Sequence, residues 1–140
     1  MGTADDLKDF ERFIKQREGA SQAFVNGDVG PLEALATPVS PATIFGPKGS
    51  YVVGADQVNA ANSNDAKHFQ KGSESHFEIL HMAAGQGVAF WAGIQRTVVR
   101  MKGKAEPIPM NLRVTEAFRR EQGEWKLVHR HADPLKLDDQ

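Results

Sequence analysis

The last third of the chain carries a glutamate and two histidines whose spacing could serve acid–base chemistry. Residues 112–119 and 125–131 alternate between apolar and polar side chains, and a Gln-Gly pair between them is typical of a tight hairpin turn. In that hairpin the alternation predicts Glu116 opposite His129 on a face that is otherwise apolar. A shift of one residue in the register would separate the two side chains.

A carboxylate beside an imidazole in an apolar cavity could act as a general acid–base pair, with Glu116 orienting His129. The alternative is a mutually hydrogen-bonded pair that only forms part of a pocket wall. We favour this alternative, or simple ligand binding, over catalysis. Residues that would act on the substrate from other elements are not evident in the sequence.

His131 follows on the same predicted strand face as His129, opposite Val114. Together with Glu116, the His-x-His pair forms a conceivable set of three metal ligands. Pairs of this kind are common in strands without any metal, and the sequence offers no fourth ligand. We therefore expect neither a metal nor another cofactor.

Further side chains are predicted to reach the same pocket from neighbouring elements. Arg17 falls within the apolar stripe of a predicted helix, where an arginine usually reaches the rim of a core but could also point into a polar pocket. Arg96 could bind an anionic group bidentately at the pocket mouth, although a position at the rim is the commoner outcome. Pockets are mostly apolar, and the remaining predicted ligand-binding residues are Phe45, Phe90, Phe118, Trp125 and His131.

Helices are predicted in the first half of the chain. Apolar side chains recur with helical spacing over residues 5–26, and Gly27 is a typical stop signal. A short helix is predicted over residues 31–36, and a third over residues 55–69. A small hairpin with a Gly/Pro-containing turn is predicted over residues 42–53, between the second and third helices.

From residue 73 onward, period-two alternation predicts four strands in an antiparallel meander. Residues 88–99 are apolar on both faces, so we expect a central strand with helices on one side and another subunit on the other. The face away from the helices is predicted to form a homodimer interface, with the apolar residues Trp91, Val99, Val128 and Ala117. Three arginines are predicted on this outer face or in solvent: Arg113, Arg119 and Arg130.

Composition excludes several classes of function. The 140 residues form one predicted domain (1–140), and a formal net charge of −1 without a basic stripe argues against nucleic-acid binding. There is no cysteine, and no apolar run approaches the length of a membrane span. The N-terminus is acidic and lacks the apolar core of a signal peptide, so we expect a cytoplasmic protein whose partner is a small molecule of unknown identity.

The order of these elements and several short motifs resemble the nuclear transport factor 2-like superfamily, in its SnoaL-like and ketosteroid-isomerase-like branch. The motifs are residues 23–28 closing the first helix, 42–47 in the hairpin, Gly54 opening the third helix, 113–120, and 123–131. The ending of the chain also resembles the association domain of calmodulin-dependent protein kinases. The resemblance implies an α+β, cone-shaped fold. In that fold N-terminal helices pack in a strongly curved, mostly antiparallel sheet and leave a pocket at the open end.

The resemblance also limits the chemistry that can be expected. The position of the isomerase's general-base aspartate is Gly46, and the position of its oxyanion-hole tyrosine is Ala20. Only the second oxyanion-hole acid is matched, by Glu116, so steroid isomerisation by that mechanism is not expected. Because one fold hosts many functions, three hypotheses remain: a ligand-binding domain with a pocket centred on Glu116 and His129, an acid–base enzyme (isomerase, cyclase or hydrolase type) using that pair, or an oligomerisation or adaptor module.

Overall fold

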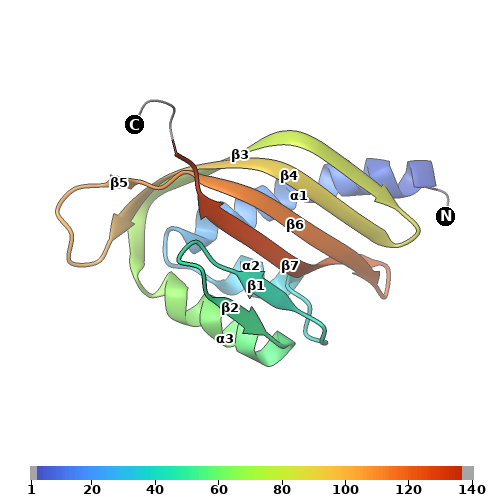
Figure 1. The fold of residues 1–140 in the computed structure, drawn as a ribbon, viewed down its shortest axis with the longest axis horizontal. Coiled ribbons are helices and arrows are strands. Elements are labelled where there is room, and N and C mark those ends of the chain that lie inside the picture. The colour runs from blue at the N-terminus through green and yellow to red at the C-terminus, as the bar shows by residue number, and fades with distance from the viewer. Residues whose placement is uncertain (1–2, 137–140) are drawn as a thin grey trace.

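The N-terminal helix lies along the concave side of a curved sheet in the computed structural model, which describes residues 3–136 (Figure 1). Helix α1 (Thr3–Phe24) buries Phe10, Ile14 and Ala20 against the sheet. It ends close to the predicted stop, because Gly27 adopts a φ of +92° and its N–H donates to the carbonyl oxygen of Phe24 at 3.0 Å. Glycine adopts this left-handed conformation without the strain that a Cβ would add.

The second and third helices and the small hairpin follow in the predicted order. Helix α2 (Gly30–Leu35) packs against α1, and the hairpin is formed by β1 (Thr43–Phe45) and β2 (Tyr51–Val53). Helix α3 (Ala55–Ala66) runs without interruption through its polar, asparagine-rich half. It ends three residues earlier than predicted, because Phe69 already begins the next strand.

The rest of the chain forms the main sheet. Its strands are β3 (Phe69–Gly85), β4 (Val88–Met101), the short β5 (Ile108–Pro109), β6 (Leu112–Glu121) and β7 (Glu124–Pro134). The strand order is β2-β1-β7-β6-β4-β3, with β5 paired to β4, and the sheet is not closed. The four long strands form the predicted antiparallel meander, while β1 joins β7 in parallel.

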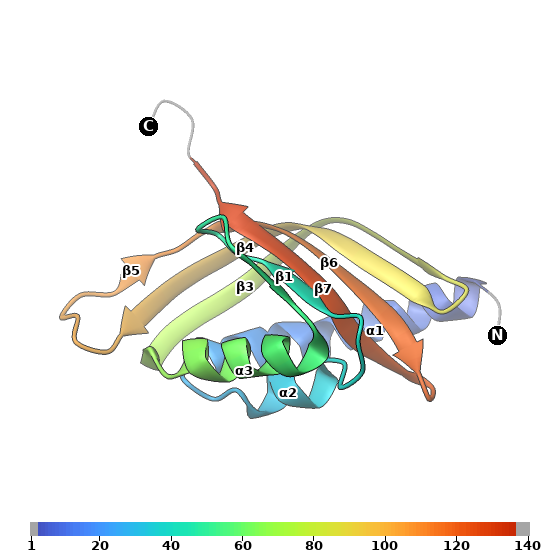
Figure 2. The same cartoon turned by 60° about the horizontal axis from the view of Figure 1, so that its bottom comes forward.

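The sheet arches over the helices, so that it has an inner face toward them and an outer face away from them (Figure 2). One cause of the bend is a shift of register between β3 and β4 after Ile79, where Leu80 is the extra residue on β3. Gly93 of β4 lies opposite Ile79 at this bend. A Cβ on Gly93 would lie 2.0 Å from the backbone oxygen of Glu78, so the backbones approach as closely as only glycine permits. The predicted α+β fold with a curved, mostly antiparallel sheet is confirmed.

The register of the last hairpin agrees with the prediction near the turn but differs from it farther along the two strands. Phe118 lies opposite Leu127 as predicted, but a shift between Ala117 and Phe118 then places Ala117 opposite His129. The predicted pairing of Glu116 with His129 is therefore wrong, and so is that of Val114 with His131, which lies opposite Thr115. The physical reason is a β-bulge at Val128, because one extra residue on β7 reverses the faces of all later side chains.

This bulge determines which positively charged side chain pairs with the buried Glu116. Arg130, predicted on the outer face or in solvent, lies opposite Glu116. Its side chain points to the inner face and bonds Glu116 there. His129 and His131 are turned to the other side of the sheet, together with Thr43 and Phe45 of β1, their partners in the parallel pairing.

The two faces of β4 are also reversed relative to the prediction. Trp91 and Val99 were expected on the outer face, but both are fully buried on the inner one. Phe90 and Arg96, expected in the pocket, lie on the outer face. Both faces of this strand are apolar. Alternation therefore assigns its residues to two faces, but it does not show which face is turned toward the helices. No helix in the described residues is long and apolar enough to cross a membrane.

Candidate functional site

Glu116 lies in the middle of the inner face, and none of its surface is exposed (0%). Its Oε1 accepts hydrogen bonds from Arg17 Nε at 2.9 Å and from Trp91 Nε1 at 2.9 Å. Its Oε2 accepts from Arg17 Nη2 at 2.7 Å and from Arg130 Nη1 at 2.8 Å. Helix α1, strand β4 and strand β7 therefore each provide a donor to one carboxylate of β6.

These partners fix the charge of Glu116. Burial by itself would raise the pKa of the carboxyl, but the charges and hydrogen bonds of Arg17 and Arg130 outweigh it and lower the pKa to about 2. A carboxylate offers about four acceptor positions, and four donors occupy them here. Glu116 is thus an ionised structural acceptor, without a free lone pair for proton transfer to a substrate.

Arg17 is buried (3% exposed) and clamps Glu116 from α1 in a two-point interaction. Its guanidinium also lies 5.5 Å from the ring centre of Phe77, which stacks on Trp91. The third guanidinium nitrogen, Nη1, is buried and has no hydrogen-bond acceptor within residues 3–136. The minority alternative for this residue, that it points into a polar pocket, is the one that the structure shows.

Arg130 connects the carboxylate to a second polar group on the inner face. Its Nη2 donates to Gln95 Oε1 at 2.8 Å, and Gln95 Nε2 donates to Ser21 Oγ and Ser75 Oγ, each at 3.1 Å. The two serine oxygens are 2.8 Å apart. Burial lowers the pKa of Arg130 and Glu116 opposes that effect, but a guanidinium remains charged at any pH near neutrality.

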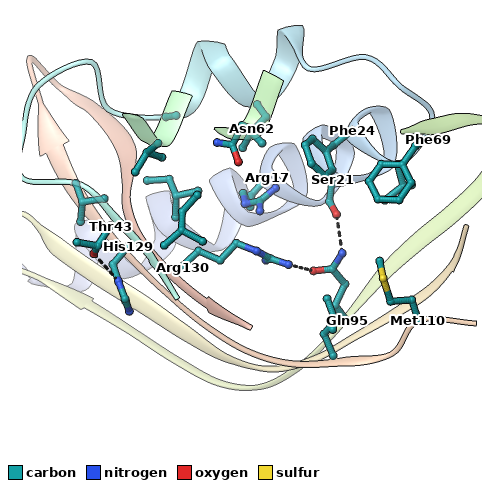
Figure 3. A pocket seen from close by; sticks show the side chains of 18 residues that line it. Arg17, Ser21, Phe24, Thr43, Asn62, Phe69, Gln95, Met110, His129 and Arg130 are labelled. Carbon is teal, nitrogen blue, oxygen red and sulfur yellow. Dashed lines mark hydrogen bonds between the residues drawn. The ribbon is translucent and has the colours of Figure 1, made fainter. Parts of the chain in front are cut away.

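A cavity of about 80 Å³ lies beside this network, between the three helices and the inner face (Figure 3). One water molecule needs about 10–15 Å³ of such space, so the cavity has room for a ligand of roughly six non-hydrogen atoms. Its polar wall is formed by Arg17, Ser21, Thr43, Asn62, Gln95, His129 and Arg130. The remaining wall is apolar and includes Phe24, Val25, Leu32, Val58, Phe69, Met110 and Leu112.

His129 contributes to the cavity wall, but its ring points away from Arg17 (Figure 3). Its Nδ1 is 2.7 Å from Thr43 Oγ1, and its ring lies edge-on to Phe45 at 4.8 Å between ring centres. Burial, followed by the neighbouring His131, lowers the pKa of His129 despite the opposing charge of Glu116. The imidazole is therefore neutral at pH 7, and it is not the partner of Glu116.

The same geometry separates the three residues that could have formed a metal site. Glu116 is on the inner face, whereas His129 and His131 are turned outward, and the half-exposed His131 is 3.6 Å from Asp133. Residues 3–136 contain no group of three or more histidine, cysteine, aspartate or glutamate side chains that could hold an ion.

The other predicted ligand-binding residues lie outside the cavity. Phe118 and Trp125 are buried in the core, where both rings contact Phe10. Trp125 also borders a more open groove of about 500 Å³ beside α1 and the β6–β7 turn, with the Arg120 guanidinium 4.3 Å from its ring centre. On the outer side, Arg96 pairs with Glu78, Phe90 packs on His81, and Phe45 lies between His129 and His131.

Sequence reasoning did not predict Arg130, Trp91, Gln95 and Ser21 as parts of the polar network. One signal was available for Arg130. A buried glutamate that stays ionised needs a partner that is charged at every working pH, and arginine meets this requirement while histidine does not. Arg130 was the nearest such residue on the facing strand, and only a bulge could bring it to the inner face.

Comparison with known proteins identifies a matching domain family and solved structures of similar fold. The model of the SnoaL-like domain matches residues 18–134, whereas no curated protein matches the sequence. A candidate dehydratase of the NTF2-like family from Streptomyces avermitilis has a TM-score of 0.74 at 17% identity, covering 93% of this chain and 98% of the other. A candidate scytalone dehydratase from Novosphingobium aromaticivorans has a TM-score of 0.74 at 13% identity, covering 93% and 86%.

A third similar structure is a candidate calcium/calmodulin-dependent protein kinase type II association domain from Thiobacillus denitrificans. It has a TM-score of 0.66 at 17% identity, covering 86% of this chain and 93% of the other. At such identities the likeness to these structures shows the fold alone.

Proposed function

We propose that this chain, which belongs to the SnoaL-like domain family, binds a small molecule in the cavity between its helices and the inner face of the sheet. The family membership confirms the resemblance expected from the sequence. The observation that supports binding is the cavity itself, which combines a largely apolar wall with a small, converging set of polar groups. This combination is typical of ligand sites.

The polar end of the proposed site is formed by Arg17 and Arg130, which line the cavity, whereas Glu116 lies between the two arginines and does not line the cavity itself. Glu116 holds the two arginines in fixed positions through hydrogen bonds of 2.7–2.9 Å. A site whose polar groups are already oriented loses little conformational entropy when a ligand binds. The arrangement therefore supports recognition more than proton transfer.

The acid–base alternative with Glu116 and His129 as partners receives no support from the geometry. The two side chains lie on opposite faces of the sheet, and Glu116 is ionised and fully hydrogen-bonded. Two proteins of similar fold are candidate dehydratases, but identities of 17% and 13% do not transfer a reaction to this chain. We therefore propose binding without assigning a reaction.

A fragment screen by NMR tests the proposal. A mixture of small, mostly apolar fragments with one polar group should shift the backbone amides of Ser21, Val58 and Leu112, which line the cavity. Val58→Trp, which fills the cavity from α3, should abolish these shifts, and Met110→Trp should do so from the β5–β6 segment. The proposal fails if fragments shift only residues of the groove beside Trp125, or if both filled variants bind as the wild type does.

The matched control is Ala60→Trp. Ala60 is on the same helix as Val58 but is exposed and does not line the cavity. This variant adds the same side chain to α3 without filling the site, so it should bind fragments as the wild type does. The dispersion of the amide spectra shows whether each variant is folded.

A further inference from the structure

The charges around the cavity do not balance. Arg17 and Arg130 line it and carry two positive charges, while the Glu116 carboxylate between them carries one negative charge, which leaves a net charge of +1. None of the eighteen lining residues, all within the described part of the chain, is an aspartate or glutamate. His129, the remaining titratable group of the wall, has a lowered pKa and is neutral at pH 7. The buried polar end is therefore a monocation.

One donor of this monocation has no acceptor from the protein. Arg17 Nη1 is buried without a hydrogen-bond partner in residues 3–136, and the Arg17 side chain extends from α1 toward Arg130 in the cavity (Figure 3). Buried donors in native proteins are almost always paired, because an unpaired one carries a desolvation penalty, and a charged one the largest. An acceptor atom supplied by a ligand would satisfy Nη1.

A cationic ligand does not fit this end of the cavity, and neither does a ligand that would have to donate a proton to Glu116. Both oxygens of Glu116 already accept two hydrogen bonds each, so the carboxylate cannot also bind an ammonium group. A dianion would leave one uncompensated negative charge in the interior, where isolated charges are strongly disfavoured. A monoanion brings the net charge of the buried group to zero.

The rest of the cavity sets the body of the ligand. Beyond the arginines the wall is formed by Phe24, Val58, Phe69 and Met110. The volume of about 80 Å³ limits the ligand to a short chain or small ring. Among monoanions, a carboxylate offers Arg17 Nη1 a charged acceptor oxygen for a single strong hydrogen bond, since Arg17 Nε and Nη2 already bind Glu116.

We infer that the ligand is a small monocarboxylic acid, bound as its anion with the carboxylate on Arg17 Nη1 and its apolar body against the aromatic and aliphatic wall. This inference rests on the proposed function, since it assigns a chemical class to the same cavity. It also explains why the chain keeps two arginines around one glutamate, where one would neutralise it.

Three probes of nearly equal shape test the inference: butanoate, butanamide and n-butylammonium. Titrations followed by the amide shifts of Ser21, Val58 and Leu112 should show butanoate binding at least tenfold more tightly than butanamide, and n-butylammonium not binding. Equal affinity for butanoate and butanamide, or tighter binding of n-butylammonium, would overturn the carboxylate assignment and leave the proposed function standing. No shift of these residues by any of the three would overturn both.

Two variants test whether Arg17 causes the preference for butanoate over butanamide. Arg17→Gln removes the charge and Nη1 together, and the preference for butanoate over butanamide should fall to less than threefold. Arg113→Gln removes the same charge from an exposed position on the outer side of β6 and should keep the full preference. A preference that persists in Arg17→Gln contradicts the inference. If that variant does not fold, Arg130→Gln, which also makes the buried group neutral, gives the same comparison.

Discussion

At the scale of residues, the site is a buried carboxylate between two guanidinium groups. Desolvating three charges is costly, and such clusters are often no more stable than apolar side chains of the same shape. Removing one member is a different matter, because the others then remain buried without compensation. Glu116 is therefore expected to be essential for the stability of this inner face whatever the ligand is.

Glu116→Gln should lower the free energy of unfolding at pH 7 by about 3–5 kcal/mol, because it leaves Arg17 and Arg130 buried without their counter-charge. Urea unfolding of both proteins measures the difference. The control is Glu78→Gln in the exposed pair with Arg96, where the loss should stay below about 1 kcal/mol. Equal losses in the two variants would contradict the assigned roles.

The same carboxyl should make stability depend on pH in a defined direction. Its pKa falls from 4.5 to about 2 on folding, so its stabilising effect is fully present above pH 4.5 and is lost as the pH falls through 2. The difference corresponds to about 3 kcal/mol. Urea unfolding between pH 6 and pH 2 should show the wild type losing its advantage over Glu116→Gln in this acidic range. An advantage that stays constant down to pH 2 would show that the carboxyl is not clamped.

His129 offers a spectroscopic check of the outward orientation of its ring. Burial, together with the nearby His131, keeps its pKa below the usual value of 6.5 although Glu116 and the hydrogen bond with Thr43 oppose this shift. An NMR titration of the imidazole protons should therefore give a midpoint below 6.5. In Glu116→Gln, which removes the opposing charge, the midpoint should move lower still. A midpoint well above 6.5 would indicate a direct ion pair with Glu116 and restore the register predicted from the sequence.

At the scale of elements, two local irregularities shape the site. The bulge at Val128 brings Arg130 to the inner face, and the bend at Ile79–His81 curves the sheet over the helices. Bulges commonly redirect side chains near functional sites. Here the redirected side chain is a member of the buried cluster, so the bulge is a part of the site and not an incidental defect.

Gly93→Ala tests the bend. An added Cβ would lie 2.0 Å from the Glu78 backbone oxygen, so two strands would have to move apart. We expect a loss of at least about 2 kcal/mol in the free energy of unfolding, at the level of severe overpacking. Thermal or urea unfolding measures it.

Gly19→Ala is the matched control for that variant. Gly19 is exposed on α1, with nothing within 4 Å of an added Cβ. Alanine there should raise the free energy of unfolding by about 0.5–1 kcal/mol, because it favours the helix. If Gly93→Ala leaves the free energy of unfolding unchanged while Gly19→Ala raises it, the strands do not approach closely at the bend.

The sequence was sufficient to predict these elements but not their irregularities. Period-two alternation and the Gln-Gly turn predicted β6 and β7 and the pairing of Phe118 with Leu127. Alternation assumes an unbroken ladder, so it could not reveal the bulge that pairs Glu116 with Arg130. It also could not orient β4, because Phe90 and Trp91 are both apolar and only the packing of α1 decides which one is buried.

At the scale of the whole molecule, the corrected faces change the surface available for the predicted homodimer. Trp91 and Val99 are buried inside and cannot contribute to it. The exposed apolar side chains of the outer face are instead Leu80, Val88 and Val98. The homodimer stays a prediction, now with these residues at its interface.

Sedimentation of the wild type should give twice the mass of the chain. Leu80→Glu or Val98→Glu places a charge in the predicted interface, so each variant should sediment as a monomer. A charge buried in an apolar interface is strongly disfavoured. Tyr51→Glu, on the exposed β2 edge hairpin, is the control and should leave the mass unchanged. A monomeric wild type at all concentrations would remove the outer face from consideration.

The proposed function requires that the cavity is a ligand site and that Arg17 forms its polar end. A crystal structure of the protein soaked with 3-bromopropanoate, which has six non-hydrogen atoms, tests this directly, because anomalous scattering locates the bromine without ambiguity. We predict the bromine beside Phe69 and Met110, with the carboxylate within hydrogen-bonding distance of Arg17 Nη1. Bromine found only in the groove beside Trp125 or on the outer face, with none in the cavity, would contradict ligand binding at Arg17.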